Sequence, residues 1–201
     1  MDGSRVYLNT RARLEVSEDA QERQAVLYEG EAFFEIALDV GRPFRVALVG
    51  SEIYVFGTRF NLYQKTSGEV VVTVLEGAVH VEGRKSRGHS AWRRELRANQ
   101  QMTYGLSGVL RDVETTSIAA SAVNWREGRL EIRDEPLANV LEELSRYTDR
   151  PIRIRDRRLK QLRVGGALST RDVRAALARL EKLAPITVED QGGVFVLRYR
   201  E

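Results

Sequence analysis

Few residue types in this sequence could carry chemistry, and their pattern points away from catalysis. The 201-residue chain has no cysteine and two histidines, which excludes disulfides and thiolate chemistry and makes a histidine-based metal site improbable. In Val79-His80-Val81, strand alternation places the histidine on the face opposite two valines, which favours a solvated side chain over a catalytic base. His89 lies in the polar, glycine-bearing segment 83–90, for which we predict a loop.

One candidate pair of adjacent carboxylates and the glycine-rich segment also favour structural roles. Glu142 and Glu143 are adjacent on a predicted helix and point away from its apolar side, so we expect them on a solvated face. Gly165 and Gly166 follow a predicted strand, but neither GxxxxGK nor GxGxxG surrounds them. The sequence therefore predicts a protein that is not an enzyme and binds no cofactor or metal.

The most distinctive charge feature is the segment 150–163, RPIRIRDRRLKQLR. In a strand, Arg153 and Arg155 share the face opposite Ile152 and Ile154, which predicts a basic strip on the surface. Two interpretations stay open: a face that only water solvates, or a surface that attracts an acidic protein or nucleic-acid phosphates. No aromatic residues alternate with these arginines to stack bases, so a protein is the better partner.

The predicted partner-binding residues combine charge with a strand that could pair with the partner; they are Arg153, Arg155, Arg157, Arg158, Leu162 and Val164. In such β-augmentation, main-chain hydrogen bonds supply affinity and charged side chains set the register.

Composition and charge describe an ordinary soluble globular protein, with 42% hydrophobic and 30% charged residues. The net charge of +3 is uneven, because residues 125–201 hold 17 Lys and Arg against 13 Asp and Glu. The densest apolar stretch, 70–75, is far shorter than the roughly 20 residues of a membrane span. The start MDGSRVYLN lacks the apolar core of a signal peptide.

Residues 1–114 have the pattern of short strands separated by glycine-containing turns, which predicts an all-β domain, either a sandwich or stacked β repeats. Two similar segments, YEGEA at 28–32 and LEGAV at 75–79, could be equivalent turns. Phe33 and Phe34 predict a strand that is buried on both faces, and Gly57-Thr58 predicts a bend within a packed strand. Residues 115–128 are expected to form a helical connector.

Residues 129–201 change to a mixed period, with two halves of about 35 residues that follow the order β-α-β, β-α-β-β. The first predicted helix has Pro136 in its first turn, and the second has Ser169 as its N-cap. Their apolar residues recur at helical spacing and are Leu137, Val140, Leu141, Leu144 and Thr148 in the first, and Val173, Ala176, Leu177 and Leu180 in the second. We expect both helices to cover one small sheet, which makes the whole chain α+β.

Several motifs in sequence carry a family resemblance. DGSRVYLNTRARLEV, GEAFFEIA, RPFRV, VFGTRFNLY, and VTVLEGAVHV followed by LRANQQ resemble the periplasmic region of FecR-type anti-sigma regulators of bacterial iron uptake. WREGRLEIRDEPLANVLEELSRY, with the half that follows it, is similar to the STN module of secretins, TonB-dependent receptors and the C-termini of such regulators. Together the two resemblances cover nearly the whole chain.

The resemblance implies an FecR-like β domain followed by an STN-like signalling domain, in the periplasm, within a single-pass inner-membrane protein. It implies binding to the N-terminal signalling domain of an outer-membrane TonB-dependent transducer, and control of siderophore-dependent iron-uptake genes through a sigma factor contacted outside this chain. The alternative is an envelope- or carbohydrate-binding β module. That module would need exposed aromatic residues on one face, for which Tyr54, Tyr63 and Trp92 are available.

Overall fold

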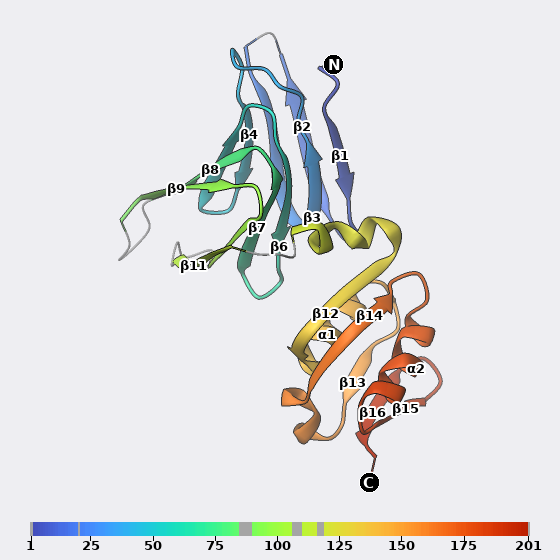
Figure 1. Cartoon of the computed structure of the whole chain (residues 1–201). Coiled ribbons are helices and arrows are strands. Elements are labelled where there is room, and N and C mark those ends of the chain that lie inside the picture. Colours follow the sequence, from blue (N-terminus) through green and yellow to red (C-terminus); the bar gives the residue numbers. More distant parts are fainter. Residues whose placement is uncertain (1, 20, 85–89, 106–109, 116–118, 201) are drawn as a thin grey trace. The chain divides into compact units, whose positions relative to one another are not determined.

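The computed structural model describes residues 2–19, 21–84, 90–105, 110–115 and 119–200. The chain divides into two compact units, Met1–Val123 and Asn124–Glu201. Figure 1 shows strands throughout the first unit and helices beside strands in the second. Within the described ranges, no helix is both long and apolar enough to cross a membrane.

The N-terminal unit is built on one bent sheet. Its strands are β1 (Arg5–Leu8), β2 (Arg13–Glu18), β3 (Arg23–Glu35), β4 (Phe44–Leu48), β5 (Ser51–Val55), β6 (Arg59–Gln64), β7 (Glu69–Glu76), β8 (Ala78–Gly83), β9 (Trp92–Arg97), β10 (Gln100–Gly105) and β11 (Leu110–Thr115). They follow the order β11-β10-β7-β6-β3-β4-β5-β8-β9, with β1 and β2 also paired to β3. Because β9 comes back into contact with β7 and β10, the sheet is nearly closed and is not a stack of repeats.

Strand β3 joins the two layers of this sheet. Its first half pairs with β2 and β4, and its second half pairs with β1 and β6. Gly30 lies between the halves with φ +83°, and a Cβ there would lie 2.5 Å from Ala12 Cα. Gly77, also at φ +83°, lies between β7 and β8. The two similar segments therefore both mark places where the chain crosses from one layer to the other.

The core of this unit comes from the inward-facing strand residues of both layers, with Phe34 stacked on Phe60 at 4.9 Å between ring centroids. Phe33 points the opposite way and is also fully buried, with Tyr7 at 6.1 Å, so burial on both faces of this strand is confirmed. Gly57-Thr58 lies between β5 and β6, so it connects two strands and does not bend a single one. The Thr58 hydroxyl donates to Ala78 O (2.9 Å) and holds this corner.

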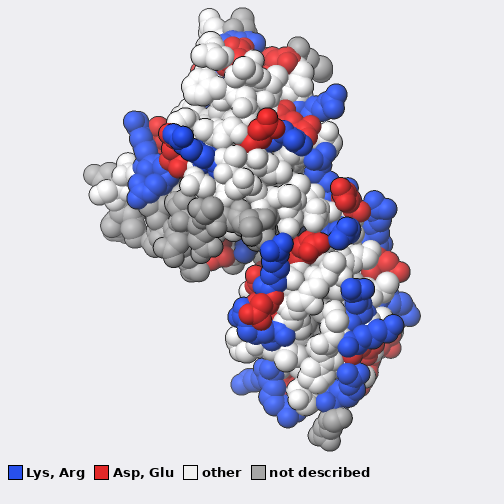
Figure 2. Space-filling view, in the orientation of Figure 1, with Lys and Arg blue, Asp and Glu red and all other residues white. Residues whose placement is uncertain are grey.

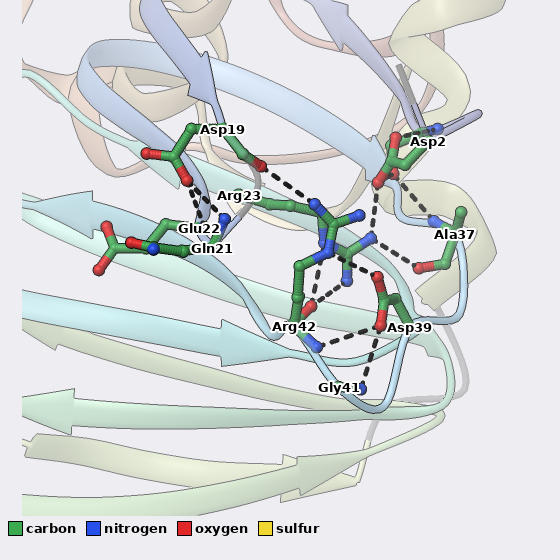
Figure 3. A network of polar contacts seen from close by, with 10 residues as sticks. Asp2, Asp19, Gln21, Glu22, Arg23, Ala37, Asp39, Gly41 and Arg42 are labelled. Atoms are coloured by element: carbon green, nitrogen blue, oxygen red, sulfur yellow. Dashed lines mark hydrogen bonds and ion pairs between the residues drawn. The ribbon is translucent and has the colours of Figure 1, made fainter.

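A buried arginine closes one end of this core (Figure 3). Arg23 starts β3 on the same inward face as Ala25, and its side chain is 1% exposed. Its guanidinium donates to Asp2 Oδ2 (2.6 Å), to Ala37 O (3.1 Å) and to Arg42 O (3.0 Å from Nε). Every one of these partners is an acceptor, so the buried charge is satisfied and fixes the N-terminal segment to the 37–42 loop.

The region between the units contains a 3-10 helix, η1 (Ala119–Glu127), within the stretch expected to be a helical connector. The division between the two units falls inside this helix. The predicted loop at 83–90 lies mostly outside the described residues, and so does His89.

The C-terminal unit has the predicted order of strands and helices. Its elements are β12 (Arg129–Pro136), α1 (Leu137–Ser145), β13 (Ile152–Ile154), the 3-10 helix η2 (Arg157–Gln161), β14 (Arg163–Ser169), α2 (Val173–Leu183), β15 (Ile186–Asp190) and β16 (Phe195–Tyr199). The prediction of one small sheet is wrong, since β12-β14 and β13-β16-β15 form two separate sheets. Helix α1 contacts β12 and β13, and α2 contacts β14 and β15, so the helices lie between the sheets and share one core.

Three details of the helix ends differ from the prediction. Pro136 precedes α1 as its N-cap residue, because its backbone still belongs to β12. Thr148 lies beyond the end of α1, where its hydroxyl accepts the Arg150 N–H (3.0 Å). The N-cap of α2 is Asp172, whose carboxylate accepts the Ala175 N–H (2.9 Å), whereas Ser169 still pairs in β14.

Candidate functional site

The arginines of β13 lie on the outer face of the three-stranded sheet. Alternation directs Ile152 and Ile154 to the core and leaves Arg153 exposed, with Arg155 exposed just past the end of the strand. Strand β13 consists only of residues 152–154. It is the outermost strand of its sheet, so only one of its edges is paired, with β16. This arrangement is the basic strip that the alternation predicts.

The neighbouring strand β16 adds two residues that the sequence analysis did not identify. β13 and β16 are parallel, and Arg153 lies opposite Val196, so Val196 and Arg198 share its outer face. Val196 is 7% exposed although it does not belong to the core cluster. Arg198 forms an ion pair with Glu189 of β15 (2.8 Å). The outer face therefore carries arginines on neighbouring strands, with Val196 between them already covered.

Arg157 and Arg158 lie on η2 and not on a strand. Asp156 caps this short helix by accepting the Arg158 N–H (3.0 Å), and fully buried Leu159 anchors it to the core. The Arg158 guanidinium donates to the Asp156 carboxylate and lies 4.6 Å from the Tyr199 ring centroid. Hydrogen bonds from the Arg158 side chain and then its N–H hold the pKa of Asp156 below its ordinary value.

The side chains of Leu162 and Val164 pack within the C-terminal unit and offer little surface to a partner. Leu162 is half-buried against the core and its C=O accepts the Leu137 N–H (2.7 Å). Val164 is 5% exposed and pairs with Glu135 of β12. A partner strand could therefore meet β14 through its backbone, whereas the Val164 side chain belongs to the core.

The free edge of β14 offers such a backbone. Thr170 N–H donates to Gly128 O. By antiparallel alternation, the backbone N–H and C=O groups of Ala167 and Ser169 therefore point away from β12. Gly165 and Gly166 in the same strand are exposed. On the face of the C-terminal unit that carries β12 and β14, Figure 2 shows an uncharged strip with Lys and Arg on both sides.

Other ion pairs of this unit hold its hairpin in place. Asp190 accepts from both Arg150 and Arg174, and Arg150 lies 3.9 Å from the Phe195 ring centroid. The hydrogen bond from Arg150 is the largest cause that lowers the pKa of Asp190. Arg150 and Arg174 are therefore paired within this unit, although the Arg174 side chain is 69% exposed and its ion pair adds little to stability.

Two buried polar clusters of the N-terminal unit have structural partners. Glu31 accepts from the side-chain amides of Asn9 (2.7 Å) and Asn61 (2.9 Å). Tyr104 shares a hydrogen bond with Ser51 (2.7 Å), and burial raises its pKa to about 12. Among the described residues no group of three or more His, Asp or Glu side chains could hold a metal ion. His80 is half-buried on the face opposite fully buried Val79 and Val81, as predicted.

Comparison with known proteins supports this description of the fold. Residues 1–80 match the family model described as FecR protein. A search of curated proteins found no match. Two crystal structures of a candidate anti-sigma factor from Parabacteroides distasonis ATCC 8503 are similar to the chain, with TM-scores of 0.83 and 0.81. Each is 24% identical, and the similarity covers 100% of this chain and 92% and 91% of theirs, which shows a common fold.

Proposed function

We propose that this chain is the sensor region of an anti-sigma regulatory protein and that it works by binding another protein. The match of residues 1–80 to the FecR family carries this proposal. The shared fold with a candidate anti-sigma factor over the full chain supports it. The buried polar groups described above serve the fold, which fits a binding protein better than an enzyme.

The partner we propose is the N-terminal signalling domain of an outer-membrane TonB-dependent transducer, which this chain would bind in the periplasm. In this proposal the C-terminal unit is an STN-like domain, and the signal controls siderophore-dependent iron-uptake genes through a sigma factor bound elsewhere in the full protein. The FecR match and the β-α-β, β-α-β-β order support this assignment.

The binding surface we propose is the outer face of β13 and β16. Arg153 and Arg155 are both exposed, and Arg153 lies beside Val196 of β16 on this face. An acidic partner surface would be steered toward these arginines and would pair with them. Arg157 lies on η2, next along the chain, and would extend the basic surface. The β14 edge is a second contact that a partner strand could use.

Calorimetric titration of the whole chain with purified transducer signalling domains tests this proposal. We expect one domain to bind and the Arg153→Glu/Arg155→Glu variant to bind at least about tenfold more weakly, which corresponds to about 1.4 kcal/mol. Raising the salt concentration should weaken the wild type more than the variant, because the variant has lost the steering charges.

The matched control is Arg179→Glu/Lys182→Glu, which reverses the same number of exposed charges on α2. This variant should bind like the wild type. Equal weakening by both double variants would show that net charge, and not the β13 face, drives association. If no signalling domain binds the wild type, the proposed partner is wrong.

A further inference from the structure

The outer surface of the N-terminal unit carries a groove of about 500 Å³ over β5, β8 and β9. This volume falls within the roughly 300–1,000 Å³ of small-molecule sites. One side of the groove is aromatic, from Tyr54, Phe56 and His80, and the other is polar, from Glu82, Arg93 and Glu95. The groove is independent of the surface proposed above, which lies in the other unit.

The aromatic side consists of rings on the outer face of the sheet that the fold covers only in part. Alternation in β5 buries Ile53 and Val55 and directs Tyr54 outward, with Phe56 next to the end of the strand. Phe56 is 39% exposed, and its ring meets His80 edge to face, with 6.5 Å between the centroids. Tyr54 lies opposite His80 in the sheet, and its hydroxyl donates to Glu52 (2.5 Å). The rings are therefore held in place and offer flat apolar surface.

Of the three aromatic residues that the sequence suggested for carbohydrate binding, this groove contains only Tyr54. Trp92 packs against the core and meets Tyr104 at 5.2 Å, and half-buried Tyr63 lies on β6. Phe56 and His80 take their places. The sequence could not show this, because their proximity depends on the pairing of β5 with β8.

The polar side of the groove has equal numbers of carboxylate and guanidinium groups. Glu82 pairs with Arg93 across β8 and β9 (3.0 Å), and Glu95 pairs with Arg97 (2.9 Å). The Arg93 side chain is 81% exposed, so its guanidinium can still meet a ligand. The lining holds two carboxylates, Glu82 and Glu95, and two guanidinium groups, Arg93 and Arg94. Such a balance favours neither an anion such as phosphate nor a cation.

A peptide strand does not fit the aromatic side of this groove. β5 is paired on both edges, with β4 and β8, and β8 is paired with β5 and β9. Their backbone groups are therefore used within the sheet, and a ligand can meet these two strands only through outward-facing side chains.

We propose that this groove binds a neutral saccharide chain of pyranose rings. The C–H face of a pyranose would stack on Phe56, the more exposed of the two aromatic rings, through dispersion contacts, and its hydroxyls would donate to Glu82 and Glu95 and accept from Arg93. This ligand combines the flat apolar surface and the uncharged hydrogen-bonding groups that the two sides of the groove require.

Isothermal titration of the whole chain with maltohexaose, cellohexaose and chitohexaose tests the proposal. We expect at least one to bind, and Phe56→Ala and Arg93→Ala each to weaken that binding at least tenfold. The control is Tyr28→Ala, because Tyr28 is equally exposed at 39% but lies outside the groove. Circular dichroism of each variant should match the wild type, because the replaced side chains are exposed.

Three outcomes would overturn the proposal. One is no binding of any of the three oligosaccharides up to about 10 mM, where even millimolar affinity is detectable. Another is equal affinity of Phe56→Ala and the wild type. The third is preferential, salt-sensitive binding of a sulfated oligosaccharide, which would assign the surface to anions. None of these bears on transducer binding, which the Arg153 and Arg155 variant tests separately.

Discussion

Arg23 in the N-terminal unit and Arg153 in the C-terminal unit both lie on β-strands, but they have opposite environments. Arg23 faces inward with Ala25 and is 1% exposed, whereas Arg153 faces outward, away from Ile152 and Ile154. The first is enclosed by Asp2 and by carbonyls of the 37–42 loop. The difference teaches that alternation decides which way an arginine points, and that distant acceptors decide whether it can be buried.

The two units also differ in how they form their cores. The N-terminal unit closes one sheet on itself, so its core depends on corners such as Gly30. The C-terminal unit encloses two helices between two small sheets, and its core is a helix–strand core.

Replacement of the two arginines should give the largest contrast. Arg23→Met removes the donors of two carbonyls and the partner of Asp2, so we expect a loss of about 3–5 kcal/mol in the free energy of unfolding. Arg153→Met should change stability by less than about 0.5 kcal/mol, because the side chain is exposed. Urea denaturation monitored by circular dichroism measures both. Similar losses from both variants would contradict the assignment of Arg23 as a structural arginine.

Truncation of a leucine in the core of the C-terminal unit should destabilise that unit and leave the N-terminal unit unchanged. Leu177 is 1% exposed, and Leu177→Ala should cost about 2–5 kcal/mol. Leu183→Ala on the same helix should cost much less, because Leu183 is 50% exposed. Amide hydrogen exchange should show the loss of protection in β12 to β16, with β3, β6 and β7 unchanged. Equal loss in both units would mean that they unfold as one cooperative block.

Local patterns predicted much of this fold, because they depend on neighbours in sequence. The helical spacing of Leu141 and Leu177 and the alternation around Arg153 are both of this kind. The separation of the C-terminal strands into two sheets depends on pairing between residues far apart, such as Arg153 with Val196. No local pattern distinguishes that pairing from one small sheet.

The burial of Arg23 illustrates the same limit. The run RQAVLY places Arg23 on one face with Ala25 and Leu27, so the direction of the side chain can be read from sequence. The acceptors that make burial possible lie 14 to 21 residues away, at Ala37, Arg42 and Asp2. For the candidate site, Arg153 and Arg155 could be placed on a face from sequence. Val196 and Arg198 could not, because β13 and β16 meet only in the folded chain.

The acid dependence of stability gives a smaller and more selective test of this buried ion pair. Partial burial acts to raise the pKa of Asp2, but the Ser4 N–H and the Arg23 guanidinium outweigh it and lower the value to about 2. Because the folded pKa is depressed below the ordinary 3.8, the Asp2 contribution is present above pH 4 and is lost as the pH falls toward 2. Asp2→Asn should therefore cost about 1–2 kcal/mol at pH 7 and little near pH 2.

The difference between wild type and variant isolates Asp2 from the other carboxylates, which protonate in both proteins. Urea midpoints at intervals between pH 2 and pH 7 would measure it. Asp134→Asn in the other unit is the control, because Asp134 pairs with Arg163 but its side chain is 76% exposed. Its effect should stay below about 0.5 kcal/mol at every pH. A pH-independent cost of Asp2→Asn would mean that Asp2 stabilises the fold by packing or neutral hydrogen bonds, and that the Arg23 charge is balanced by the loop carbonyls alone.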